Sequence, residues 1–171
     1  MKDNQSTSRL ITIAFFIALE IILTRFLSIN TPFLRIGFGF LPVAMLGILY
    51  GPIWAGAAYA VGDLLGIMMF PSGAFFPGFT ISAFLTGLTF GFFLYNKPVT
   101  WKRVFMASAI VCLLINMCLD TLWLYILMDK AVLGLIPARI VKSVVMLAIQ
   151  VMLIPMVWNR LLSKIRLIQA T

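Results

Sequence analysis

Long apolar runs, broken by glycine, proline or charged residues, set the pattern of this chain. Apolar runs of this length are typical of helices that enter or cross a lipid bilayer. The pattern predicts helices at about residues 9–29, 37–50, 53–70, 79–96, 103–128 and 136–162. The second run is short and contains Pro42, so we expect it to be tilted or kinked.

Composition places the chain among integral membrane proteins. Of its 171 residues, 63% are hydrophobic and 11% are charged, and the mean hydropathy is +1.10. A soluble domain has roughly half apolar and about a quarter charged residues. The first run, Leu10 to Ile29, matches a span better than the apolar core of a signal peptide, so we expect it to be retained. We predict an all-α membrane protein with six transmembrane helices, in which residues 1–171 form one domain.

The distribution of basic residues predicts the orientation. Short cytoplasmic loops are enriched in Lys and Arg, and an even number of spans puts both termini on one side. With both termini in the cytoplasm, eight of the thirteen basic residues are cytoplasmic: Lys2, Arg9, Lys97, Lys102, Arg103, Arg160, Lys164 and Arg166. The net charge of +8 then reflects topology and contact with anionic lipid headgroups, and it needs no nucleic-acid partner.

Several kinds of active site lack their residues in this sequence. The chain has no histidine, and its two cysteines, Cys112 and Cys118, lie six residues apart in one apolar run. The usual zinc, haem and iron-sulfur ligand sets are therefore missing, as is any Ser-His or Cys-His catalytic pair. We predict that the protein is not an enzyme and that it uses no metal and no cofactor.

Cations within or beside the apolar runs are candidates for ligand binding. A charge inside a bilayer is costly unless it faces a cavity, a partner charge or the interface. Arg139 and Lys142 are three residues apart, which puts both on one helical face near the outer end of the last run. Two cations on one face favour an anion site over contact with lipid headgroups. Arg35, just before the second run, is a third candidate.

A polar and aromatic stripe follows in the fifth run, within "NMCLDTLWLY". Helical spacing places Asn116, Asp120 and Trp123 on one face, where they could bind the edge and face of a flat heterocycle. Hydrogen bonding between helices, with the indole in an interfacial belt, explains the same residues equally well. Asp63, in "VGDLLG", is either a helix anchor or a ligand acceptor. Both interpretations stay open at this point.

Four segments of the sequence together resemble a known family. They are "NTPFLRIGFGFLPVAMLGILYGPIWAGAAYAVGDLLG", "FPSGAFFPGFTISAFLTGL", "NMCLDTLWL" and "LIPARIVKSVVM". The chain resembles the folate-specific S component of energy-coupling factor (ECF) vitamin transporters over nearly its whole length. The parts "SGAFFPGFT" and "PAR" carry the resemblance most specifically.

The resemblance implies a six-helix substrate-binding protein of the bacterial cell membrane. Such a protein captures folate or a related pterin outside and delivers it inwards. It does so with a transmembrane coupling subunit and two ATP-hydrolysing subunits, which are separate chains. Ala14 and Ala18 form a small-residue groove that resembles the first-helix motif by which S components dock onto the coupling subunit.

The chemistry of folate suggests a role for each candidate residue. The pterin edge offers an N–H and an amino group to Asn116 and Asp120, while Phe76 and Trp123 cover the ring faces. The two carboxylates of the glutamate tail suit the available cations. The predicted substrate-binding residues are Arg35, Phe76, Gly78, Asn116, Asp120, Trp123, Arg139 and Lys142. Within this set, we expect Arg35 and Arg139 to bind the carboxylates.

The segment "FPSGAFFPGFT", residues 70–80, is predicted to break the helices at the outer surface. Irregular backbone at membrane depth is tolerated where it lines a cavity. We predict a gate in which Phe75, Phe76 and Phe79 close on the bound ring, with Phe33 as a further aromatic wall. The alternative is a rigid turn whose rings lie at the lipid interface.

Three other functions fit the sequence less well. An S component for another vitamin would have the same scaffold, but an uncharged substrate leaves the three candidate cations without a purpose. A self-sufficient secondary carrier is often built from two related halves, and no repeat relates residues 1–85 to residues 86–171. A membrane enzyme would need a metal set or a nucleophile and base.

Overall fold

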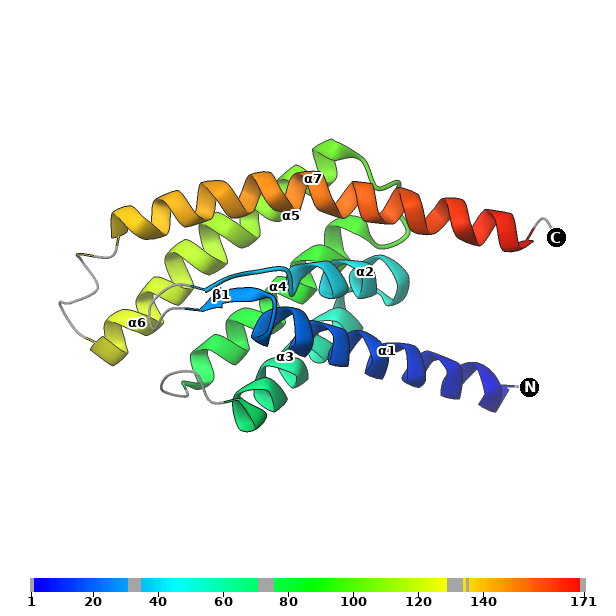
Figure 1. The fold of residues 1–171 in the computed structure, drawn as a ribbon, viewed down its shortest axis with the longest axis horizontal. Helices are drawn as coiled ribbons and strands as arrows, with labels where there is room; N and C mark the ends of the chain where they lie inside the picture. Colours follow the sequence, from blue (N-terminus) through cyan, green and yellow to red (C-terminus); the bar gives the residue numbers. More distant parts are fainter. Residues whose placement is uncertain (1, 31–34, 71–75, 129–133, 135, 170–171) are drawn as a thin grey trace.

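The helices follow the apolar runs of the sequence. The computed structural model describes residues 2–30, 35–70, 76–128, 134 and 136–169. Its helices are α1 Lys2–Arg25, α2 Phe40–Tyr50, α3 Pro52–Met69, α4 Pro77–Leu94, α5 Trp101–Ile110, the π-helix η1 Val111–Leu119, α6 Asp120–Met128 and α7 Ile136–Gln169 (Figure 1). The segments α5, η1 and α6 follow one another without a break and form one long rod.

Five helical rods in the described part of the chain are long and apolar enough to cross a membrane. They cover Thr7–Arg25, Pro52–Met69, Pro77–Leu94, Trp101–Leu127 and Ile136–Arg160. The sixth predicted span, α2, has only 11 residues. At 1.5 Å per residue it is about 16 Å long, against about 30 Å for the hydrocarbon core. The six predicted helical regions therefore exist, but the second is too short to cross a bilayer alone.

A small β-hairpin accompanies the helices of this otherwise helical fold and was not predicted. Strand β1, Ser28–Asn30, pairs antiparallel with strand β2, Arg35–Gly37. The first helix ends at Arg25 and not at residue 29, and the Ser28 hydroxyl donates a hydrogen bond to the carbonyl of Thr24. This bond satisfies a carbonyl of the last helical turn, and the backbone beyond it is free to pair with β2.

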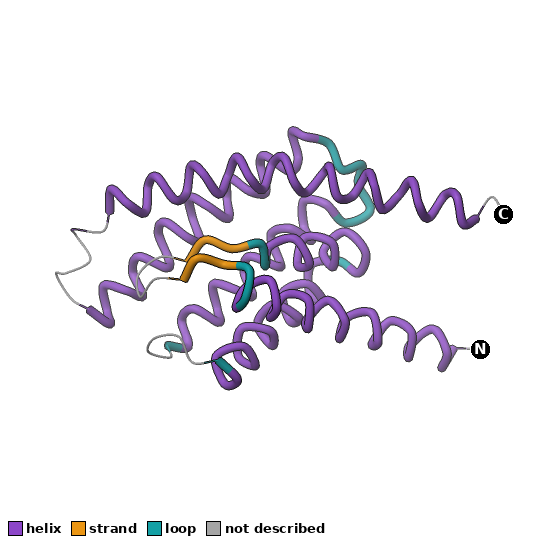
Figure 2. Tube along the Cα trace, viewed as in Figure 1, coloured by secondary structure: helices purple, strands orange, loops and turns teal. Residues whose placement is uncertain are grey.

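The two ends of the bundle differ in what they carry. Both termini lie at one end (Figure 1). At the other end α6 finishes and α7 begins, and the hairpin points towards this end (Figure 2). The beginning of α4 also lies at the hairpin end, so segments distant in sequence meet there.

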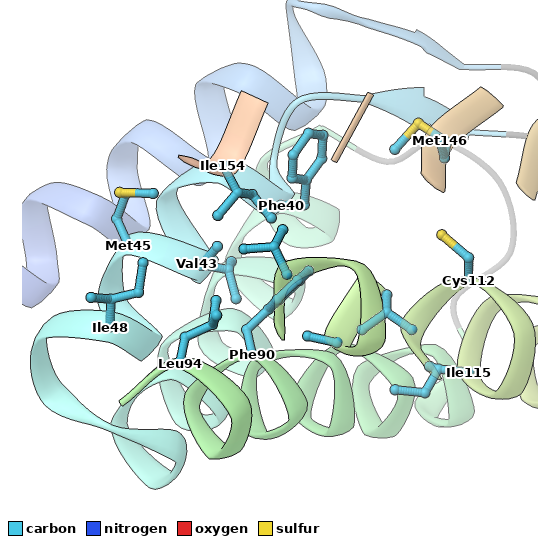
Figure 3. Packing of buried hydrophobic residues seen from close by; sticks show 14 residues of the cluster. Phe40, Val43, Met45, Ile48, Phe90, Leu94, Cys112, Ile115, Met146 and Ile154 are labelled. Atoms are coloured by element: carbon cyan, nitrogen blue, oxygen red, sulfur yellow. The ribbon is translucent and has the colours of Figure 1, made fainter. Parts of the chain in front are cut away.

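The hydrophobic core lies where α2 meets α4, the α5–η1 rod and α7 (Figure 3). Phe90, Leu94, Val104 and Ile154 are completely buried within it. Eight of the eleven residues of α2 are buried, which explains why this helix is apolar on nearly all sides. The short helix is thus a core element surrounded by longer ones.

Glycines allow α4 to pack closely against the α2–α3 turn. A Cβ at Gly91 would lie 2.2 Å from the Cα of Pro52, and one at Gly87 would lie 2.4 Å from the carbonyl oxygen of Ala55. Both neighbours are backbone atoms, which cannot move aside as a flexible side chain does. The two helices therefore need glycine at these positions.

Gly91→Ala is expected to destabilise the protein. Overpacking of this kind costs about 1–3 kcal/mol, which corresponds to a fall in melting temperature of a few to about 10 °C. Gly134→Ala is the matched control, because a Cβ there meets nothing within 4 Å. Thermal unfolding in detergent measures both changes. Equal melting temperatures for the two variants would contradict the close packing.

Candidate functional site

Two aromatic rings meet over a glycine at the start of α4. The rings of Phe76 and Trp123 have centroids 5.6 Å apart and are tilted by 46°. A Cβ at Gly78 would lie 2.5 Å from atoms of both rings, so glycine is required beneath them. Phe79 extends the group, with its centroid 6.3 Å from that of Phe76. The loop before α4 and the rod that ends in α6 are thereby joined by contacts between aromatic rings.

A hydroxyl connects these rings to a buried carboxylate. The indole N–H of Trp123 donates to Oγ of Ser82 at 3.1 Å. The Ser82 hydroxyl also hydrogen-bonds the carboxyl group of Asp120. Since the serine oxygen accepts from the indole, its own proton is available to the carboxylate. The hydrogen-bonded chain from Trp123 through Ser82 to Asp120 therefore orients both the indole ring and the carboxylate.

A π-helix positions Arg139. At the end of η1 the backbone N–H of Asp120 bonds the carbonyl of Ile115, five residues back, and not that of Asn116, as an α-helix would require. The Asn116 carbonyl instead accepts a hydrogen bond of 2.7 Å from Nη2 of Arg139, a residue that is 4% exposed. π-helical turns are rare and are often found at functional sites. Here the altered helix supplies the acceptor that holds a buried guanidinium.

Three charged residues lie near Asp120. Its carboxyl group interacts electrostatically with Lys142, Arg139 and Asp63. Asp63 also accepts a hydrogen bond of 3.0 Å from the hydroxyl of Thr80, which links α3 to α4. This contact supports the interpretation of Asp63 as a helix anchor.

Buried polar atoms without a hydrogen-bond partner remain in this region. Among the described residues they include Oδ1 of Asp120, Nε of Arg139 and Oγ1 of Thr121. A buried donor or acceptor without a partner costs about 1–3 kcal/mol. The first two atoms have opposite polarity, one accepting and the other donating, and a ligand with both groups would satisfy them.

The structure brings most of the predicted site residues together. We call them, with Ser82, the polar–aromatic cluster: Phe76, Gly78, Ser82, Asn116, Asp120, Trp123, Arg139 and Lys142. Arg35 lies in β2, in the hairpin directed at the same end of the bundle, but its side chain is outside the described part. Phe33, Phe75 and residues 71–75 of the predicted gate are also outside it.

Two features of the cluster were not predicted. Ser82 lies four residues after Gly78 on the same helical face, and this spacing was the available signal for it. The π-helix has no such signal, and it changes how Asn116 takes part. Its carbonyl binds Arg139, and its side chain hydrogen-bonds the thiol of Cys112.

The predicted docking residues lie on a different surface. Ala14 and Ala18 are both exposed on α1, while Ile13 and Glu20 of the same helix are buried. A small-residue groove on an outward face is open to another membrane helix.

Comparison with known proteins identifies the family. Residues 4–160 match the model of the S component of ECF-type riboflavin transporters. The chain is 51% identical over 150 residues to the folate transporter FolT of Clostridium novyi, covering 88% of this chain and 87% of that protein. It is 32% identical over 152 residues to FolT of Leuconostoc mesenteroides, covering 85% of this chain and 81% of that protein.

Solved structures agree with this relationship. The fold matches the crystal structure of FolT bound with folic acid at a TM-score of 0.81 and 37% identity, over 86% of this chain and 90% of that one. The S component of a bacterial ECF transporter matches at a TM-score of 0.62 and 23% identity, over 91% of this chain and 98% of that one, and supports the fold alone.

Spanning helices around an internal polar–aromatic cluster define a multi-pass membrane protein of the bacterial cell membrane. Within that class, the chain belongs to the family of ECF transporter S components. The family takes part in transport and is not a family of enzymes. The resemblance first found in four segments of the sequence is confirmed.

Proposed function

We propose that this S component binds folate or a related pterin from outside the cell and delivers it inwards as part of an ATP-driven importer. The observation that carries the proposal is the unpartnered Oδ1 of Asp120, whose carboxyl group is linked through Ser82 to the tilted ring pair of Phe76 and Trp123. A flat heterocycle with donors on its edge has the chemistry that this arrangement accepts. The relationship to FolT proteins supports the proposal.

The pterin headgroup fits the deep part of the cluster. Its N3–H and 2-amino group are adjacent donors, and an ionised carboxylate accepts such a pair with strong charge-assisted hydrogen bonds. Phe76 and Trp123, whose rings are tilted and not parallel, are placed to contact the ring faces. Separation of the two rings would admit the heterocycle between or against them.

The assignment of the cations changes from that suggested by the sequence. Arg139 was expected to bind a tail carboxylate, but it lies against Asn116 and interacts with Asp120, so we assign it to the headgroup. Arg35 remains the candidate for the glutamate tail, because its strand is directed at the end of the bundle where α7 begins. Lys142 contributes positive charge beside Asp120.

The transport step needs other chains. We propose that both termini are cytoplasmic, with the hairpin end outside, which fits their position at one end of the bundle (Figure 1). The exposed Ala14 and Ala18 would contact the coupling subunit, and two ATPase subunits would provide the energy. The hairpin end would then receive the vitamin.

Binding and uptake measured separately test this function. The purified chain in detergent is expected to bind folic acid by itself, whereas uptake of labelled folic acid by vesicles requires the coupling subunit, both ATPases and ATP. Uptake by this chain alone, driven by an ion gradient, would identify a secondary carrier instead. Absence of folic acid binding would overturn the proposed substrate.

Riboflavin is the second candidate substrate, because the matching family model describes riboflavin transporters. Its flavin ring presents a carbonyl, an N–H and a carbonyl along the corresponding edge, so it offers Asp120 only one donor. Its sugar-alcohol chain is uncharged and gives Arg35 no anion to bind. We therefore expect excess riboflavin to leave folic acid bound, and displacement by riboflavin would favour this second candidate.

A further inference from the structure

Two buried polar atoms of the cluster have complementary hydrogen-bonding needs. Oδ1 of Asp120 is an acceptor without a donor, and Nε of Arg139 is a donor without an acceptor. The two side chains interact electrostatically but form no direct hydrogen bond within the described part of the structure. Each atom therefore has its hydrogen-bonding capacity available for a ligand.

The surrounding contacts keep these two atoms in place. Ser82 hydrogen-bonds the carboxyl group of Asp120 and accepts the indole N–H of Trp123, so the carboxylate is held from one side. Nη2 of Arg139 is fixed at 2.7 Å from the Asn116 carbonyl. That carbonyl is the one bypassed by the backbone bond from Asp120 to Ile115. Preorganised groups of this kind discriminate between ligands, because they cannot rotate to suit a different pattern of donors and acceptors.

The pattern required of a ligand is a donor next to an acceptor. In a 2-amino-4-oxopteridine, the donors N3–H and 2-NH₂ lie beside the acceptor O4. In the 2,4-diamino analogue, position 3 is an acceptor in the neutral ring and position 4 carries a donor. A donor at position 4 would face the N–H of Arg139, and neither donor would be satisfied.

We propose that Arg139 is the residue by which the site distinguishes a 4-oxopteridine from its 4-aminopteridine analogue, reading O4 while Asp120 reads the adjacent donors. This inference rests on the proposed function. It goes beyond that function by assigning substrate selectivity to one guanidinium and to the π-helix that holds it.

Folic acid and aminopterin provide the test, because they differ only in the substituent at position 4, an oxygen or an amino group, and in the hydrogen on N3 that accompanies the oxygen. Calorimetry on the detergent-solubilised chain gives the affinity for each. We expect the unmodified chain to prefer folic acid by at least about 10-fold, which is the range expected when a buried donor loses its acceptor. Arg139→Met should weaken folic acid binding and reduce the preference, leaving only the part that comes from the N3–H donor of folic acid at Asp120.

Lys142→Met is the matched control, since it removes a cation from the same face of α7. It is expected to retain the preference for folic acid, whatever its effect on affinity. Equal binding of both compounds by the unmodified chain would overturn the inference while leaving folate binding intact. So would an unchanged preference in Arg139→Met, or loss of the preference in Lys142→Met alone. Equal binding by the unmodified chain overturns the inference even if a variant fails to fold, whereas a preference in the unmodified chain is assigned to Arg139 by the comparison of Arg139→Met with Lys142→Met.

Discussion

Asp120→Asn is expected to weaken folic acid binding by about 100-fold or more. The ionised carboxylate accepts adjacent donors of the pterin, and each hydrogen bond to a charged group contributes about 1.5–3 kcal/mol. Asparagine has nearly the same shape, but it replaces one acceptor oxygen with an amide NH₂ group. This group is a donor and cannot accept a hydrogen bond from the donors of the ligand. Isothermal titration of the detergent-solubilised protein measures the loss.

Asp63→Asn is the control for this substitution. Asp63 is the second acid near the cluster, and it accepts a hydrogen bond from Thr80 between two helices. Asparagine keeps an oxygen that can accept that bond, so we expect the affinity to change by only a few-fold. Similar losses in both variants would show that net charge, and not recognition by Asp120, controls binding. Unchanged affinity in Asp120→Asn would remove Asp120 from the site.

Ala14→Trp and Ala18→Trp are expected to abolish uptake while leaving folic acid binding intact. Both alanines are exposed on α1, so an indole there fills the groove that a partner helix would occupy. Neither residue belongs to the polar–aromatic cluster, so the ligand site should be unaffected. The two measurements are binding by the purified chain and ATP-dependent uptake by vesicles that contain the complete transporter.

Ala148→Trp supplies the control for the docking surface. Ala148 is also an exposed alanine, but it lies on α7, away from the proposed groove. The same increase in volume there is expected to permit uptake. Normal uptake with tryptophan at both Ala14 and Ala18 would exclude this groove as the docking site. Loss of binding in those variants would show that α1 acts on the ligand site directly.

The relative placement of candidate residues could be predicted where one helix carries them. Asp120 and Trp123 are three residues apart in α6 and do lie on one side, as α-helical spacing implies. Contacts between helices were harder to foresee. Ser82 is one small polar residue in an apolar helix, and its importance depends on an indole 41 residues later in the chain.

Residue type alone did not predict the partners of Arg139. A cation on a helical face suggested an anionic partner, and its spacing from Lys142 was sound. Its position beside Asn116 depends on η1. In this π-helix the backbone N–H groups bond carbonyls five residues back and not four, which leaves the Asn116 carbonyl available to Arg139. Nothing in the apolar pattern of residues 111–119 distinguishes a π-helix from an α-helix, because both are compatible with the same buried side chains.

Apolar run length, charge placement and residue type predicted a multi-pass helical membrane protein and a set of candidate site residues, and the resemblance of four segments indicated the family. These properties are local, since run length sets span length and residue type sets the available chemistry. The hairpin, the burial of α2 and the joint orientation of Asp120 and Arg139 emerged only from the folded chain. Each depends on hydrogen bonds or packing between segments that are distant in sequence. Such contacts stabilise the protein only in the folded chain, so the pattern of one segment does not predict them.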